Sequence, residues 1–367
     1  MNVNRLRWKF PILLLAVGTA GMFIVGCASK DVRQATVATV NGEEIKGAEF
    51  RESLGVPAGV FAVVDIPVEK KKEALDQMVA VRLMAQDARS RGIDNTSRFK
   101  EIVRQNDPVV RIRALVRKEI EGNLKVTRKE IKAEIAKVKQ AKKGISDGDA
   151  AIRAVKSVSA GRIRKIQEDL IAVAKKETAA VVDNQAMARI GKEENVPDDV
   201  VLASVGAEKI LYGDVRKIFR GSSPAGTPHG QPGFSINPVL AGNILDRELA
   251  MRALAAYAKK QGVDGSDGYK AVRREMERSV LRNLVADNVA AKNIEVTDQE
   301  IEAVYAKNTA PMVRKGMKVP VDMAAMLKAQ IRAGLRDEKG KKSIDAYLAG
   351  LKEKAKITIN DDILPGI

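Results

Sequence analysis

The feature that most constrains the fold is a short sequence pattern that occurs twice. Residues 37–50, VATVNGEEIKGAEF, alternate Val and Thr with small residues, turn at Asn41-Gly42 and resume at Ile45. Asn-Gly between two β-prone runs is a strong hairpin signal, because both turn residues must tolerate a positive φ. Residues 202–215, LASVGAEKILYGDV, follow the same plan. The chain is therefore predicted to contain two hairpins, each leading into a helix.

The agreement between the two regions extends well beyond the hairpins. Leu75 corresponds to Leu245 and Arg82 to Arg252, each 170 positions later. An ordered series of matches at one offset indicates two copies of one module. The same shift also aligns Gly92-Ile93-Asp94 with Gly262-Val263-Asp264, Val126-Thr127 with Val296-Thr297, and Glu130-Ile131 with Glu300-Ile301.

The amino-acid composition predicts that each module is mainly helical. Aromatic residues make up only 4% of the chain, and Ala, Lys, Arg and Glu are abundant, which argues against a β-sandwich or barrel. The 367 residues suffice for two domains that each bury a core. We therefore predict a mainly α fold with small β hairpins, built from two tandem copies of a helical module. The first copy covers residues 37–190, a linker 191–200, and the second copy 201–367.

Helix signals recur at matching places in both copies. Thr127 with Glu130, and Thr297 with Glu300, have the spacing of a capping box, which predicts a helix start at each threonine. Gly92 stands where a left-handed residue would end the preceding helix. Further helices are expected over 68–91, 97–122, 149–190, 243–261, 268–292 and 323–356.

Breaks in the second copy are predicted from Gly and Pro. The segment 308–321, with Pro311, is expected to interrupt the helices, and a second interruption is expected near Gly340. The segment 221–233 is expected to be a loop. Residues 357–359, Ile-Thr-Ile, predict a final strand that pairs with one of the hairpins and so brings the two ends of its module together.

The N-terminus predicts export and lipidation. Residues 1–26 have a basic start followed by an apolar run of about 16 residues, shorter than the roughly 20 that a membrane-spanning helix needs. The following Cys27 completes a sequence that resembles the bacterial lipobox, whose cysteine becomes the lipidated first residue. The alternatives are an uncleaved anchor or an ordinary buried cysteine. We expect a lipoprotein signal peptide over 1–26 and a lipidated tether over 27–36.

The location follows from the same segment. Neither Ala28 nor Ser29 is the aspartate that retains enterobacterial lipoproteins at the inner membrane. We therefore expect a lipid anchor on the periplasmic side of the cell envelope, in the inner leaflet of the outer membrane, with palmitate among the acyl chains. Two or three acyl chains anchor a protein stably, at ~0.8 kcal/mol per buried CH₂.

The charge of the chain restricts its partners. A formal net charge of +17 favours acidic partners or anionic lipid headgroups. Nucleic acid is not expected as a partner, because the basic residues are interleaved with Glu along helices and few aromatic residues are available for stacking.

Catalytic and cofactor chemistry is not expected. His229 is the only histidine and lies in the Gly/Pro loop, where a nucleophile and base are rarely held in hydrogen-bond geometry. One histidine and one cysteine are too few for a zinc site, and no Ca²⁺ loop pattern is present. No phosphate-binding Gly-rich Lys motif occurs, so ATP-driven action is not expected either. We predict no cofactor and no metal.

Four residues are candidates for contact with a bound polypeptide. Arg82 and Arg252 match between the copies and lie among apolar neighbours. Each could form an ion pair between helices or contact an acidic segment of a bound polypeptide. We expect both side chains instead to snorkel, with the charged group at the surface. Met312 and Met317 lie beside basic residues, where they are hard to bury, and methionine suits surfaces that bind varied apolar sequences.

These features together resemble a known family. The V-A-x-V-N-G-x-x-I hairpin, the V-T-x-x-E-I helix start and the closing Tyr347-Leu348-x-x-Leu351 segment are similar to the peptide-binding domain of SurA-type periplasmic chaperones and PrsA-type lipoprotein foldases. The similarity covers most of 37–140 and 201–360. Many members carry an inserted parvulin prolyl isomerase domain. Here the gaps at 308–321 and 144–148 are too short for any domain, and the parvulin histidines are missing, so isomerase activity is not expected.

Two functions are compatible with this sequence. The first is a lipid-anchored, ATP-independent periplasmic chaperone, a holdase that binds unfolded exported or outer-membrane proteins without catalysis. The alternative is a structural accessory lipoprotein of an envelope complex for secretion or polysaccharide export, which would dock one fixed partner. The two differ in whether many polypeptides or a single protein occupy the modules.

Overall fold

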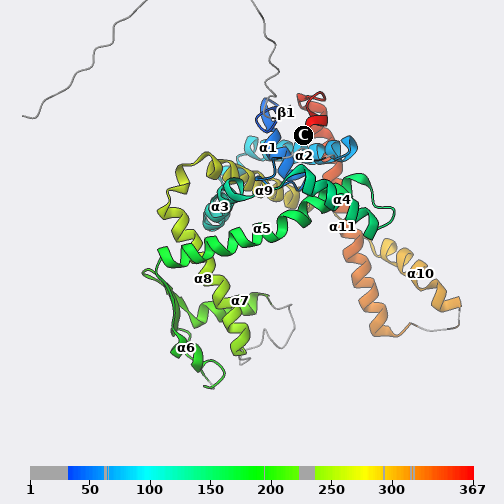
Figure 1. Ribbon diagram of the computed structural model, residues 1–367. Coiled ribbons are helices and arrows are strands. Elements are labelled where there is room, and N and C mark those ends of the chain that lie inside the picture. The colour runs from blue at the N-terminus through cyan, green and yellow to red at the C-terminus, as the bar shows by residue number, and fades with distance from the viewer. Residues whose placement is uncertain are drawn as a thin grey trace, which may run out of the picture.

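The fold is mainly helical with small antiparallel sheets, as predicted. The computed structural model describes residues 32–61, 64, 66–193, 195–222, 236–291, 294–314, 316 and 319–367. Within these ranges, helices form a body from which two extensions project (Figure 1). The predicted signal peptide, Cys27, His229 and Met317 lie outside the described residues.

The first half of the chain, residues 32–190, begins with a hairpin and continues as helices. Its elements are β1 (Thr36–Val40), β2 (Glu43–Lys46), α1 (Gly47–Ser53), α2 (Val68–Ser90), the 3₁₀ turn η1 (Ile93–Asn95), α3 (Ser97–Asn123), α4 (Arg128–Ala141), α5 (Asp147–Glu177), β3 (Ala180–Val182) and α6 (Asn184–Arg189).

The second half, residues 201–367, has a similar order of elements. These are β4 (Val201–Val205), β5 (Glu208–Leu211), α7 (Tyr212–Ser222), α8 (Pro238–Lys260), the 3₁₀ turn η3 (Val263–Gly265), α9 (Asp267–Ala291), α10 (Asp298–Arg314), α11 (Val321–Lys354), β6 (Ile357–Ile359) and the 3₁₀ turn η4 (Leu364–Gly366).

The local signals act as the sequence predicts. Asn41 and Gly42 adopt positive φ angles of 52° and 86° at the first hairpin turn. Gly92 is left-handed, with φ of 71°, after the end of α2. At the start of α4 the Thr127 hydroxyl accepts from the Glu130 amide at 3.3 Å, while Glu130 accepts from the Thr127 amide at 2.8 Å. Both bonds recur at α10, so the two predicted capping boxes are confirmed.

Each sheet combines strands from both halves of the chain. The strand β6 does pair with a hairpin, but with the first one: it lies antiparallel to β1 in the order β2-β1-β6. The strand β3, in turn, pairs with β4 in the order β3-β4-β5. The expectation that β6 brings together the two ends of its own module is therefore wrong. Each half contributes its closing strand to the hairpin of the other.

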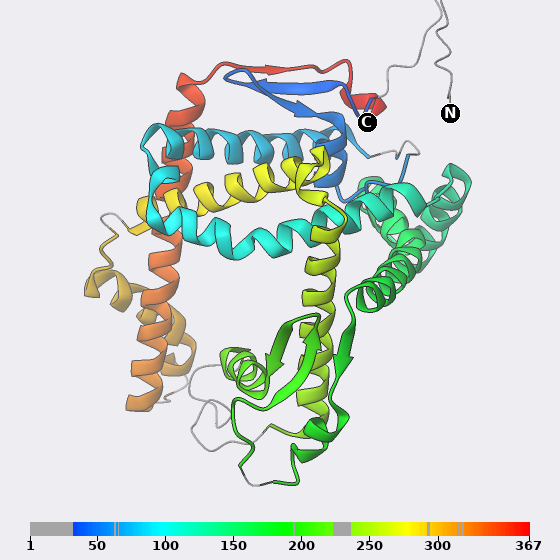
Figure 2. The ribbon, with the colours of Figure 1, turned by 90° about the vertical axis from the view of Figure 1, so that its left-hand side faces the viewer.

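The long helices are interleaved in the same way. Helix α9 of the second half packs against both α2 and α3 of the first. Figure 2 shows these three helices stacked beneath the first sheet. Helix α8 packs against α3 and α5. The halves are thus intertwined rather than placed side by side.

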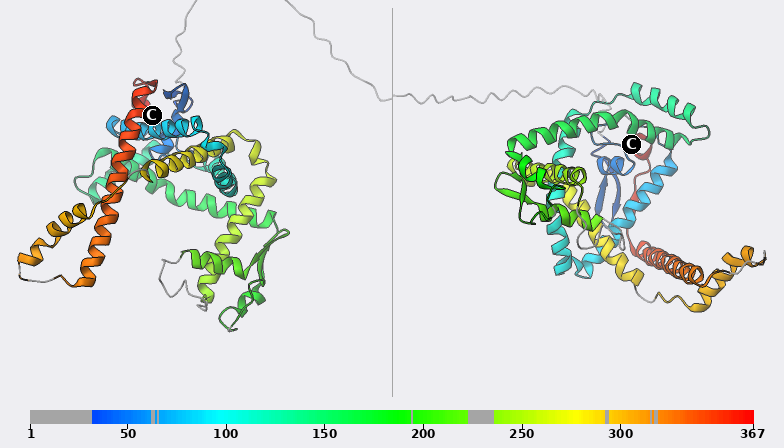
Figure 3. Two further views of the ribbon diagram at one scale, coloured as in Figure 1. Left: turned by 180° about the vertical axis from the view of Figure 1, so that it is seen from behind. Right: turned by 90° about the horizontal axis from the view of Figure 1, so that it is seen from below.

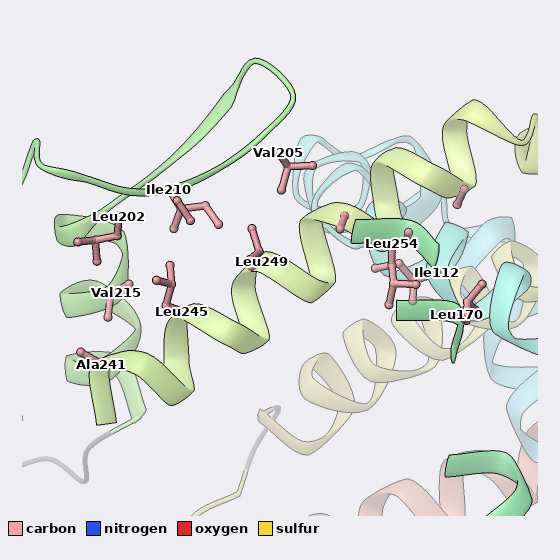
Figure 4. Packing of buried hydrophobic residues seen from close by; sticks show 14 of the residues in the cluster. Ile112, Leu170, Leu202, Val205, Ile210, Val215, Ala241, Leu245, Leu249 and Leu254 are labelled. Atoms are coloured by element: carbon pink, nitrogen blue, oxygen red, sulfur yellow. The ribbon is translucent and has the colours of Figure 1, made fainter. Parts of the chain in front are cut away.

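The cores reflect this interleaving. Around the second hairpin, Leu245 and Leu249 of α8 face Leu202 and Ile210, all at most 2% exposed (Figure 4). The same cluster includes Ile112 of α3, from the first half. Another cluster joins the first hairpin to Leu364 and Ile367, which are 1% and 0% exposed. Neither core is confined to one side of the linker expected at 191–200.

Three local expectations were wrong. The segment 149–190 is not all helix, because it contains β3, whose partner β4 lies beyond the linker. Helix α10 runs through Pro311 to Arg314, so the break is shorter than predicted. The proline removes one backbone hydrogen bond, to the carbonyl four residues earlier, and the remaining turns of the helix keep theirs. Helix α11 passes Gly340 without interruption, because this glycine is buried and tertiary packing outweighs its low propensity.

A helical arm projects from the body on the side away from the second sheet. We call α10 with the N-terminal part of α11 (residues 298–314 and 321–335) the arm; Figures 1 and 3 show it leaving the body at an angle. Gly340 is the one buried residue of α11, a helix that is described throughout. In the described part of the chain, no helix is both long enough and apolar enough to cross a membrane.

Candidate functional site

A well-formed pocket on the described surface lies at the root of the arm. We call it the arm-root pocket; its volume is about 860 Å³, within the range typical of ligand sites. It opens between α9 and α11, close to the end of α2. Its lining residues are Arg91, Ile93, Val285, Asn288, Val289, Ile294, Glu295, Lys339, Ser343 and Tyr347.

Two helices supply the walls through regular spacing. Val285, Asn288 and Val289 follow at i, i+3 and i+4 on α9, so they share one face of that helix. Lys339 and Tyr347 stand eight residues apart on α11, two turns along one face, with Ser343 between them. An aliphatic surface of α9 therefore faces a polar surface of α11.

The Tyr347 side chain is fixed at one end of the pocket. Its hydroxyl donates to the Asp87 carboxylate of α2. The Arg91 guanidinium lies 5.5 Å from the centre of the tyrosine ring, and its Nε is 2.6 Å from Asp87. Burial and the Asp87 carboxylate both raise the pKa of Tyr347, so the phenol stays protonated at neutral pH.

Lys339 is fixed at the other end. Its Nζ donates to the Glu295 carbonyl at 2.6 Å and lies 2.7 Å from Glu300 Oε1. The bond from Lys339 and the amide of Thr297 together lower the pKa of Glu300 to about 2. The capping box of α10 is thereby tied to α11, so the start of α10 is fixed against that helix.

Two other polar residues of the lining are not paired in the way that Tyr347 and Lys339 are. The Asn288 and Ser343 side chains form no hydrogen bond with any residue that the structure describes. An amide and a hydroxyl can each donate and accept, so both remain available to a ligand.

The arm carries apolar side chains into solvent. Val321 is 84% exposed, Val313 63% and Met326 56%. The candidate Met312 is half-buried on α10, beside these residues in sequence. These side chains come from both helices of one projecting part of the molecule, and exposed apolar patches are a common sign of a contact surface.

Arg82 does not snorkel, contrary to expectation. Only 1% of the residue is exposed, and its Nη2 donates to Glu49 Oε2 at 2.7 Å and to the Glu44 carbonyl at 3.3 Å. Burial lowers the pKa of Arg82, an effect that the Glu49 carboxylate opposes. The alternative of an ion pair between elements is the one observed.

A residue that the sequence did not single out completes this cluster. Arg278 of α9 forms ion pairs with Glu43 and, at 3.4 Å, with Glu49. Burial tends to raise the pKa of Glu43, but Arg278 and the hydrogen bond from Gln86 lower it overall. We call Glu43, Glu49, Arg82 and Arg278 the buried ion cluster; it joins the first hairpin, α1 and α2 to α9 of the other half.

Arg252 occupies the matching position at the second hairpin. Its Nη1 lies 3.1 Å from Glu208, its Nη2 3.3 Å from Asp214, and it donates to the Lys209 carbonyl at 2.9 Å. The side chain is 22% exposed and its partners more so. Arg252 therefore forms the same kind of ion pairs as Arg82, but with greater access of solvent to the charged groups.

The structure and the comparisons add little on chemistry. Among the described residues, no group of three or more His, Cys, Asp and Glu side chains could hold a metal ion. Comparison of the chain with protein-family models, with curated proteins and with solved structures gives no match. The function must therefore be argued from the site itself.

Proposed function

We propose that the protein is a lipid-anchored, ATP-independent holdase that binds unfolded exported or outer-membrane proteins in the periplasm, without isomerase catalysis. The observation that carries the proposal is the set of exposed apolar side chains on the arm, together with a pocket at the root of the arm that has an aliphatic wall. A non-polar segment of an unfolded chain would be shielded from water by such surfaces, which need no chemical step.

The architecture supports this proposal in two further ways. We propose that the halves are two copies of one module similar to the peptide-binding domain of SurA-type chaperones, because the order hairpin, helices, 3₁₀ turn, helices and strand occurs in both. Edge strands β2, β3, β5 and β6 offer backbone groups for pairing with extended segments. The net charge of +17 would slow the escape of acidic clients.

The anchor is a separate part of the proposal. Cys27 would carry the acyl chains and hold the protein at the inner leaflet of the outer membrane. Labelled palmitate should be incorporated into the wild-type protein in cells, and the change Cys27→Ala should abolish the label. Incorporation into the alanine variant would show that Cys27 is not the acceptor.

The holdase activity is tested by aggregation. Purified protein should suppress the aggregation of a denatured outer-membrane protein, followed by light scattering, at near-stoichiometric amounts. The double change Val321→Ser with Met326→Ser should weaken suppression severalfold. Val173→Ser is the matched control, because Val173 is 45% exposed on α5, outside the arm. Absence of suppression by the wild-type protein would refute the proposal.

A further inference from the structure

We propose that the arm-root pocket is the primary binding site, and that its ligand is an uncharged, extended polypeptide segment carrying one large apolar side chain. This inference rests on the proposed function and deepens it, since it assigns the first contact with a client to one pocket.

The aliphatic wall of the pocket favours a ligand with an apolar group. Val285, Val289 and Ile93 belong to or pack against one hydrophobic cluster at the junction of α2, α3, α9 and α11. Val285 is only 1% exposed, whereas Val289 and Ile93 are half-buried and remain open to the pocket. A Leu or Phe side chain placed here would extend an existing core, so its burial is favourable without any rearrangement of the wall.

The charged groups argue against an anionic ligand. Arg91 is already paired with Asp87, and Lys339 with Glu300. The Glu295 carboxylate adds a further negative charge to the lining. With each cation neutralised in place, the pocket offers no site for a fatty-acid carboxylate or a phosphate. A neutral ligand suits it better.

The free polar groups point to a polypeptide backbone. Asn288 on α9 and Ser343 on α11 stand on the opposing walls, and neither has a hydrogen-bond partner among the described residues. A peptide group needs one acceptor for its N–H and one donor for its C=O, and an amide or a hydroxyl supplies both. An apolar side chain packed against α9, with its backbone held by these two residues, uses both the aliphatic wall and the two unpaired neutral side chains of the lining.

The test uses purified full-length protein and fluorescently labelled short Gly/Ser peptides with one central Leu. Anisotropy should show saturable binding, and replacing the central Leu by Gly should weaken it by at least about tenfold. Ser343→Trp and Asn288→Trp, which fill the pocket from opposite walls, should each weaken binding by a similar factor. Val173→Trp on α5 should leave affinity unchanged, and circular dichroism should show all three variants folded.

The outcomes separate this inference from the proposed function. Peptide affinity within twofold of wild type in both pocket-filling variants would overturn the inference, even if the protein suppresses aggregation. Tighter binding of a dodecanoate probe than of the peptide, lost in the same variants, would also overturn it and assign the pocket to an anionic lipid. Peptide binding that the variants abolish, in a protein that fails to suppress aggregation, would support the pocket and refute the holdase.

Discussion

Replacing Arg82 by leucine should destabilise the protein far more than the same change at Arg252. Both arginines occupy the same position after their hairpins; Arg82 forms ion pairs with two carboxylates and Arg252 with three. They differ in solvent access: the Arg82 side chain is 2% exposed and that of Arg252 22%. Leucine keeps an apolar body at either site, so the comparison isolates the charge.

The loss of stability in each variant depends on how well the carboxylates that lose their arginine are still hydrated or paired. Breaking a fully buried ion pair costs about 3–5 kcal/mol, because the remaining charge is desolvated without a partner. At Arg82 the loss should be smaller, about 2–3 kcal/mol, since Glu43 and Glu49 are 26% and 34% exposed and retain Arg278. At Arg252 the carboxylates are largely hydrated, and the loss should be about 0–1 kcal/mol.

Urea unfolding followed by circular dichroism at 222 nm measures the difference. With a slope of about 3 kcal/mol per molar urea, Arg82→Leu should lower the midpoint by roughly 0.7–1 M. Arg252→Leu should lower it by less than about 0.3 M. Equal shifts in the two variants would refute the argument that burial determines the value of these ion pairs.

Three further predictions concern local structure. Thr127→Ala removes the cap of α4 and should lower the free energy of unfolding by about 1 kcal/mol, measured by urea unfolding; no loss would mean that the cap contributes nothing in this setting. Glu300 has a folded pKa of about 2, below its ordinary 4.5, so its stabilising effect is present above pH 4.5 and is lost as the pH falls toward 2. Glu300→Gln should therefore flatten the decline in stability over that interval, whereas an unchanged acid-unfolding curve would contradict the assignment. Gly47→Ala would place a Cβ 1.9 Å from the Val32 carbonyl oxygen and should destabilise by about 1–3 kcal/mol, while Gly122→Ala, with open space around it, should be neutral or slightly stabilising.

The sequence was enough to predict the features that depend on residues close to one another along the chain. The Asn41-Gly42 turn and the threonine caps involve residues at most a few positions apart, so their chemistry is visible in the local pattern. The boundaries of α2 and α3 follow from the same kind of signal. These interactions would be formed whichever way the halves are arranged.

There is a physical reason why the exchange of strands between the halves could not be predicted from the sequence. The two hairpins share one pattern, so β6 would satisfy the free edge of either, and sequence alone does not distinguish them. The choice depends on how α9 packs between α2 and α3, which involves contacts across the whole chain. The short strand β3 was missed because the strand with which it pairs, β4, lies beyond the linker.

The buried ion cluster and the arm-root pocket were missed for related reasons. Arg278 stands where the first half has Pro108, so the repeat gave no hint of its role. Arg82 was expected to reach solvent because its carboxylate partners come from the hairpin and α1, not from its own helix. The pocket draws on α2, α9 and α11, and its residues share no motif.

One measurement tests the central claim most directly: chemical crosslinking in living cells, followed by capture of the full-length protein and identification of the polypeptides crosslinked to it. A holdase should yield many different exported and outer-membrane polypeptides, with crosslinks concentrated on the arm and around the arm-root pocket. A single partner in fixed proportion, bound elsewhere on the protein, would contradict the account and favour a structural component of an envelope complex.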